Sequence, residues 1–214
     1  MKFFTLFSVV AALLAPAQAG GLAPVYRSSI AIIDPTTRAG MTGASWHAGC
    51  PVPIRDLRLL TLDFWGFDGS VHPGRLIVHR DQAVRVRTVF RKLFYAHFPI
   101  RRMQLIDAYG GDDHRSMTAN NTSAFNCRFV SGTSRWSMHA FGRAIDINPV
   151  QNPWVSGGDV SPPAGRRYAN RSLQAKGMIH AGDAVVTAFA SVGWKWGGYW
   201  TGSKDYQHFS SNGR

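Results

Sequence analysis

Glutamate is missing from this chain, so all twelve of its acidic residues are aspartates. This absence excludes every mechanism that requires a glutamate, including the HExxH helix of many metalloproteases. A carboxylate that works as a general base here must therefore be an aspartate. Acidic residues are also few beside the 24 lysines and arginines, which leaves a formal net charge of +12 on 214 residues.

Cysteine is nearly as scarce, because the chain has only Cys50 and Cys127. Neither has another cysteine nearby, which argues against a cysteine-based zinc cluster. In an exported chain an even number of cysteines favours a disulfide. We therefore expect Cys50 and Cys127 to be joined, with two buried free thiols as the alternative.

Long hydrophobic runs are also lacking. The longest apolar stretch, Phe3 to Leu14, is shorter than the roughly 20 residues that a membrane-spanning helix needs. Lys2 precedes it and Ala17-Gln18-Ala19 follows it, which is typical of a cleaved export signal over residues 1–19. An uncleaved anchor or a buried N-terminal helix is the alternative. We expect a mature protein without a transmembrane segment, in the periplasm, the cell wall or the extracellular space.

The remaining composition is that of a globular protein, with 45% hydrophobic and 12% aromatic residues. Residues 20–45 are rich in Gly, Ser, Thr and Pro and are expected to form a flexible N-terminal arm. Residues 46–214 show no internal repeat and no linker. Their length suits a single domain with a sizeable core.

Hydrophobic patterning over the first half of this domain predicts a hairpin followed by a helix. Leu57 to Trp65 is strand-like, Asp68-Gly69 is a turn signal, and Leu76 to His79 is expected to return as the second strand. Asp81 is placed to cap a helix that continues to about His97 with apolar residues along one face.

The second half mixes short strands, loops and one more helix. Strands are expected over Ile100 to Tyr109 and Ala144 to Ile147, and an exposed loop over Pro149 to Gly165. An apolar stripe that begins at Val185 predicts a helix ending near Gly193. The mixture predicts an α+β fold rather than alternating βαβ units.

The excess of positive charge requires a partner or a solvated surface. No helix-turn-helix, zinc-finger or RNP pattern supports nucleic acid. An exported basic protein is more often attracted to an anionic envelope polymer or membrane surface, although a merely solvated basic surface is an equal alternative. The cations gather on the predicted helix and in smaller clusters: Arg85, Arg87, Arg91, Lys92, Arg101, Arg102, Arg166 and Arg167.

Residues capable of catalysis concentrate in two short segments, 137–146 and 205–209. His139, Asp146 and His208 would supply two imidazoles and one carboxylate, a set that suits a catalytic zinc with its fourth position open to water. Asp205, three residues before His208, is the candidate base that takes a proton from that water. The polar segment Gly110 to His114 is a weaker candidate for a metal loop and is more typical of a turn.

The joint pattern is more specific than its single residues. Ser-x-His-x-x-Gly-x-Ala-x-Asp from Ser137 to Asp146, followed by Asp-x-x-His, resembles the D-alanyl-D-alanine carboxypeptidase and dipeptidase family of zinc peptidases. That family shares its site architecture with lysostaphin-type peptidases and the hedgehog signalling domain. The resemblance extends from about Cys50 to Phe209 and includes the segments 123–128, 146–149 and 193–198.

The resemblance implies a single domain with a small, mostly antiparallel central sheet and flanking helices. It also implies one zinc ion per chain on His139, Asp146 and His208, with Asp205 as the acid/base carboxylate. Arg128 would stabilise the oxyanion of the scissile carbonyl. Ser137 would orient the ligand loop or touch substrate.

Two features depart from the family pattern. Relatives often have an aromatic pair between the base and the last histidine, and this chain has Tyr206-Gln207. Arg128 lies only eleven residues before His139, closer than in many relatives, which weakens its assignment.

The sequence therefore predicts an exported zinc peptidase of peptidoglycan stem peptides that works as a monomer. A D-alanyl-D-alanine carboxypeptidase is the first choice. An endopeptidase that cuts inside the stem, such as at L-Ala–D-Glu, is the close alternative. A catalytically inactive, zinc-bearing module that binds the cell wall is the alternative from another class.

Overall fold

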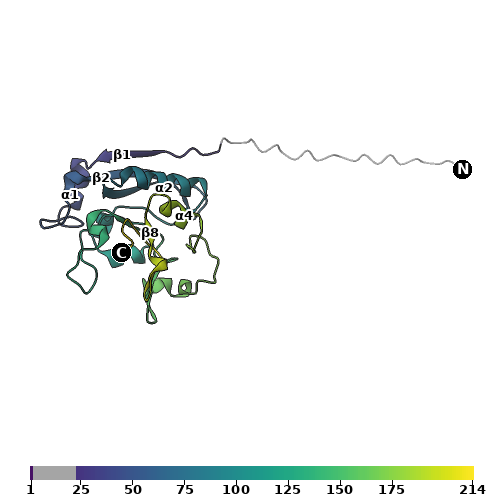
Figure 1. Ribbon diagram of the computed structural model, residues 1–214. Helices are drawn as coiled ribbons and strands as arrows, with labels where there is room; N and C mark the ends of the chain where they lie inside the picture. Colours follow the sequence, from purple (N-terminus) through teal and green to yellow (C-terminus); the bar gives the residue numbers. More distant parts are fainter. Residues whose placement is uncertain (2–22) are drawn as a thin grey trace.

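The computed structural model describes Met1 and residues 23–214, which form an α+β domain of small sheets and short helices (Figure 1). Except for Met1, the predicted export signal lies outside these residues. Over residues 23–214 no helix has both the length and the hydrophobicity that a membrane crossing requires. The helices are α1 (Pro35–Met41), η1 (Ile54–Asp56), α2 (Ala83–Tyr95), η2 (Ile106–Tyr109), α3 (Asp113–Thr118), η3 (Met138–Phe141), η4 (Pro163–Ala169), α4 (Ala184–Ala190) and η5 (Gly197–Tyr199), where η marks a 3₁₀ helix. The strands are β1 (Ser28–Ile32), β2 (Leu57–Gly66), β3 (Val71–His79), β4 (Pro99–Ile100), β5 (Ala144–Asp146), β6 (Trp154–Ser156), β7 (Asp159–Ser161), β8 (Lys195–Trp196), β9 (Lys204–Asp205) and β10 (His208–Ser210).

The largest sheet has the order β1-β2-β3, with all pairs antiparallel, and β4 adds a short parallel pair at the end of β2. The predicted hairpin of β2 and β3 is confirmed, and β3 begins earlier than expected, at Val71. Alternate residues of β2 enter two different cores. Leu60 and Leu62 pack against α2 and α4, whereas Leu57 and Leu59 pack on the opposite face with Met41.

The predicted helix after this hairpin is confirmed as α2, which packs on β2 and lies beside α4 (Figure 1). Val86, Val89 and Phe90 are among its buried residues, as the apolar stripe predicts. The expected cap is wrong, because Gln82 occupies the N-cap position without a side-chain cap bond. The Asp81 carboxylate instead accepts hydrogen bonds from Arg143 and from the Gln82 amide.

The N-terminal segment differs from the flexible arm expected over residues 20–45. Strand β1 pairs with β2 along all five of its residues. Helix α1 is capped by Asp34, whose side chain accepts a hydrogen bond from the Thr37 backbone, and its last residue, Met41, is fully buried. Gly and Pro content suggested a loose arm, but the cap and the buried methionine hold residues 28–41 against the domain.

The strand predicted over Ile100 to Tyr109 does not extend past Ile100, the last residue of β4, so this prediction is wrong for the rest of the segment. Two asparagine side chains take the backbone hydrogen bonds that a neighbouring strand would otherwise take. Asn148 accepts from the Arg101 N–H at 2.9 Å, and Asn121 accepts from the Gln104 N–H at 2.9 Å. The segment therefore continues without regular strand pairing and ends in η2.

The exposed loop expected over Pro149 to Gly165 is also corrected. Its middle forms the hairpin β6–β7, and β6 pairs on its other side with β9. These short strands carry few apolar residues in alternation, so only their pairing in the β7-β6-β9 sheet identifies them. The second predicted helix is confirmed as α4, whose first turn is capped by Asp183.

The disulfide expected between Cys50 and Cys127 is present in the structure. It links two segments that are 77 residues apart in the chain and packs in the same core as Met41 and Leu57. Because Cys127 is directly followed by Arg128, the bridge also anchors the chain where it enters the candidate site.

Replacing both cysteines with serine should lower the free energy of unfolding by roughly 2–4 kcal/mol, since the bridge restricts a long loop of the unfolded chain. Urea unfolding followed by tryptophan fluorescence measures the difference. The reduced wild-type protein should unfold at the same urea concentration as the double variant. An unchanged midpoint in both would show that the bridge adds no stability.

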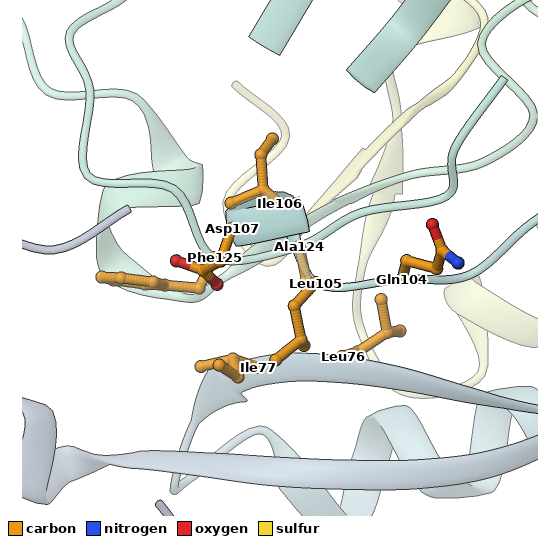
Figure 2. Close-up of a pocket in the computed structure, with 8 residues that line it drawn as sticks. All are labelled: Leu76, Ile77, Gln104, Leu105, Ile106, Asp107, Ala124 and Phe125. Atoms are coloured by element: carbon orange, nitrogen blue, oxygen red, sulfur yellow. The ribbon is translucent and has the colours of Figure 1, made fainter. Parts of the chain in front are cut away.

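A small cavity of about 10 Å³ lies between β3 and the segments 104–107 and 124–125 (Figure 2). Leu76 and Ile77 of β3 face Leu105 across it. This volume is about that of one water-sized probe, so the cavity is too small for a peptide substrate. It is a packing gap behind the candidate site.

Candidate metal centre

Three side chains from separate elements meet at the second sheet, which has the order β5-β10-β8. The register of β10 against β5 places His208 directly opposite Asp146. His139 enters from η3. The Asp146 carboxylate lies 3.0 Å from His208 Nδ1 and 3.2 Å from His139 Nε2, and the two nitrogens are 3.3 Å apart. The three residues predicted as zinc ligands are thus brought together.

The outer nitrogen of each imidazole is held by a backbone carbonyl. His139 Nδ1 lies 2.6 Å from the oxygen of Ala124, and His208 Nε2 lies 3.1 Å from the oxygen of Arg214. A carbonyl only accepts hydrogen bonds, so these nitrogens donate. The inner nitrogens, Nε2 of His139 and Nδ1 of His208, then face the carboxylate. Metal-binding histidines usually have this arrangement, in which the other ring nitrogen donates to a carbonyl and fixes the ring.

Electrostatics make this pocket suited to a cation. Asp146 is deeply buried, which by itself raises its pKa, but the charges and hydrogen bonds of His139 and His208 hold that pKa well below its usual range. Burial likewise lowers the pKa of His208, yet its hydrogen bond and charge interaction with Asp146 raise it overall. The carboxylate therefore stays ionised and favours positive charge beside it.

The spacing of the donor groups is close to that around a zinc ion. Zinc–nitrogen and zinc–oxygen bonds of about 2.0–2.1 Å in tetrahedral geometry separate the ligand atoms by roughly 3.3 Å. The two inner nitrogens are 3.3 Å apart, and the nearest carboxylate oxygen of Asp146 is Oδ1 for His208, at 3.0 Å, and Oδ2 for His139, at 3.2 Å. Two imidazoles and one carboxylate leave one position of a tetrahedron for water or substrate, so the donor set fits a catalytic ion.

The short helix η3 that carries His139 is fixed at both ends. Ser137 is its N-cap, and its hydroxyl accepts a hydrogen bond from the His139 N–H at 3.3 Å. Gly142 ends it with φ of +64°, and a Cβ there would come within 2.5 Å of the His79 backbone nitrogen. The Ser and Gly of the motif thus have a direct structural role, which is to orient His139.

Asp205 belongs to β9, in the third sheet, and approaches the ligand set from that side. Burial, reinforced by the nearby charge of Asp146, raises its pKa to about 7. The residue is only partly buried, but its Oδ1 is sealed from solvent and has no hydrogen-bond partner. Gly197 packs so closely that a Cβ there would lie 2.6 Å from the Asp205 carbonyl oxygen.

Unsatisfied polar atoms are concentrated around this centre. Within the described part of the chain, three buried side-chain atoms lack a hydrogen-bond partner: Arg128 Nε, Asp205 Oδ1 and Gln207 Oε1. Asp205 and Gln207 lie three residues and one residue before His208, and the Asn126 N–H, two residues before Arg128, donates to the His139 carbonyl. Buried orphan atoms are rare in folded proteins and mark places where a ligand or water completes the site.

Arg128 has an acidic partner in the structure. Its guanidinium forms an ion pair with Asp113 at 2.8 Å, in the first turn of α3. Sequence reasoning missed Asp113 because it treated residues 110–114 as a polar turn. Asp112 does cap α3 there, but its neighbour Asp113 orients the arginine. Only the position of α3 in the fold reveals this partner.

Replacing Asp205 with asparagine should stabilise the metal-free protein above pH 7. The pKa of Asp205 is higher in the folded state than in the unfolded chain, so stability is lost as pH rises from about 4 through 7. Each pKa unit corresponds to about 1.4 kcal/mol, which predicts a gain of a few kcal/mol for Asp205→Asn at pH 8 and almost none at pH 4. Urea unfolding in the presence of a chelator measures both values. A gain that is equal at the two pH values would contradict the raised pKa.

Residues 131–211 match a family model described as D-alanyl-D-alanine carboxypeptidase. The match contains the three converging residues and Asp205, and it begins three residues after Arg128. Searches among curated proteins and solved structures found no match. The class of protein that the site and this match support is a peptidase. Over the matched residues, the resemblance to the D-alanyl-D-alanine carboxypeptidase family is confirmed.

Proposed function

We propose that the protein is an exported zinc metallopeptidase that hydrolyses peptidoglycan stem peptides, acting as a D-alanyl-D-alanine carboxypeptidase. The observation that carries the proposal is the convergence of His139, Asp146 and His208, with both inner imidazole nitrogens aimed at the carboxylate. The family match over 131–211 supports the proposed substrate class. Zinc is the proposed cofactor, with one ion per chain.

A zinc ion bound to these three residues would supply Lewis acidity, which polarises the scissile carbonyl and acidifies water. The chain's own residues supply the proton transfers. Asp205 takes a proton from the attacking water on its carboxylate and delivers it to the nitrogen of the leaving amine. A pKa of about 7 in the metal-free site suits a group that must both accept and donate a proton near neutral pH, and a bound cation would lower it.

Arg128 is proposed to stabilise the negative charge that develops on the carbonyl oxygen. Its Nε is buried and without a partner, which leaves a donor available, while the ion pair with Asp113 fixes the plane of the guanidinium. Ser137 holds His139 through its cap bond, and we assign it this orienting role ahead of substrate contact.

Export and the partners of the protein are part of the proposal. The signal pattern of residues 1–19 and the disulfide between Cys50 and Cys127 favour an oxidising compartment outside the cytoplasm. The surplus of 24 lysines and arginines over twelve aspartates favours a site of action near anionic envelope polymers.

Digestion of purified muropeptides, with the products weighed by mass spectrometry, tests the proposed reaction. A carboxypeptidase removes one alanine from a stem that ends in D-Ala-D-Ala. Cleavage inside the stem, with loss of a longer fragment, would show an endopeptidase. Unchanged muropeptides in the presence of zinc, together with retention on insoluble cell wall, would show a binding module instead.

A further inference from the structure

A second hollow lies outside the proposed metal centre, beside the turn that joins β2 and β3. Its volume is about 350 Å³, a size that accommodates a small ligand. The lining residues include Phe64, Phe67, His72, Arg101, Arg102 and Gln104. None of its lining residues is a proposed ligand or proton carrier. The strand-like segment 121–123 lies between the two sites, because Thr122 pairs with Met103 and Ser123 pairs with Asp146.

Positive charge in this hollow is not balanced by the residues around it. Arg101 has no ion-pair partner among the described residues, and the Arg102 guanidinium donates only to the Tyr109 hydroxyl, at 3.3 Å. The one acid in the lining, Asp68, lies 2.9 Å from His72 and balances at most one of the two arginines. Lys176 adds a further cation at the edge, where its ammonium donates to the Phe67 carbonyl at 2.9 Å. An anionic occupant would therefore be favoured.

The wall that carries the two arginines is held rigidly. The side chains of Asn148 and Asn121, both fully buried, accept the backbone N–H groups of Arg101 and Gln104. These are the two bonds that prevent the segment from forming a longer strand. Because the backbone is fixed from behind, the arginine side chains are presented from a pre-organised base, which lowers the entropy lost on binding.

Another part of the lining is aromatic. Phe64 is buried and its ring lies 5.8 Å from the imidazole of His72, while Phe67 is partly exposed. A lining that combines apolar rings with two guanidinium groups suits a ligand that has both a carbon skeleton and an anionic group. Guanidinium groups match the oxygens of phosphate in a bidentate manner.

We infer that this hollow is a binding site for the phosphate ester of a polyol, as found in phosphate-containing polymers of the cell envelope. Arg101 and Arg102 bind the phosphate oxygens, and Phe64 and Phe67 contact the carbon chain. The inference does not depend on the peptidase reaction. Binding in this hollow would hold the protein on an anionic polymer while the metal centre remains accessible.

Titration of the purified full-length protein with glycerol phosphate, followed by NMR chemical shifts, tests the site. The double variant Arg101→Ala/Arg102→Ala should bind at least about ten-fold more weakly, because it loses charge-assisted hydrogen bonds. The matched control is Arg85→Ala/Arg91→Ala, which removes the same charge from exposed positions of α2 and should bind within about two-fold of wild type. Both variants should retain the wild-type unfolding midpoint.

Three results would overturn the inference. Equal weakening in the two double variants would show a diffuse charge effect with no defined site. An affinity for acetate equal to that for glycerol phosphate would show that the hollow does not prefer phosphate. Binding to phosphatidylglycerol vesicles but not to soluble polyglycerol phosphate would place the contact at a membrane surface and not in the hollow.

Discussion

Alanine in place of His139, Asp146 or His208 is expected to abolish stoichiometric zinc binding and to reduce peptide hydrolysis by roughly 10³-fold. A catalytic zinc supplies several kcal/mol of transition-state stabilisation, and each 1.36 kcal/mol corresponds to a factor of ten in rate. Asp146 should be the most damaging of the three, because its removal leaves two buried imidazoles without their shared carboxylate. Metal analysis of the purified variants and the muropeptide assay measure the two effects.

The control for these variants is His97→Ala, which removes an exposed histidine at the end of α2 that stacks on Trp65. It should keep one zinc per chain and full activity. One zinc per chain in all three ligand variants would contradict the assignment of these residues as zinc ligands, whatever their activity.

Asparagine at position 205 is expected to lower turnover by about 10²–10⁴-fold while zinc remains bound, because the amide cannot accept a proton. Asp205→Glu should keep partial activity at best. Its additional methylene moves the carboxylate by about 1 Å, and a misplacement of this size can cost up to 10²-fold. Rates are compared in the muropeptide assay at equal zinc content.

Asp159→Asn is the matched control, since Asp159 is an exposed aspartate of β7 in the same sheet as Asp205. It should leave turnover unchanged. Wild-type turnover in Asp205→Asn would show that another group carries the proton.

The parts of this structure that sequence predicts best are those with strong local periodicity or a joint motif. The apolar stripe of α2 and the hairpin of β2 and β3 follow from period and turn signals. The convergence of His139 with His208 follows only from the resemblance, because the two residues are 69 positions apart and carry no local signal for contact. The register of the β5–β10 pair places His208 opposite Asp146, and η3 brings His139 to both.

The sequence-based predictions that are wrong share one physical cause: tertiary contacts determine the local structure in these segments. Buried asparagines divert the segment after Ile100, although its apolar residues suggest a strand. Pairing with β2 orders a Gly- and Pro-containing N-terminal segment that composition alone describes as loose. The ion pair of Arg128 with Asp113 is formed by residues fifteen positions apart, and neither signals the other in the sequence.

Zinc titration of metal-stripped protein, with stem-peptide hydrolysis as the readout, tests the central claim most directly. Activity should be absent without metal, rise in proportion to added zinc and reach its plateau at one equivalent per chain, and Asp146→Ala should stay inactive throughout. Full hydrolysis by the metal-free protein, or a plateau that Asp146→Ala also reaches, would contradict the account.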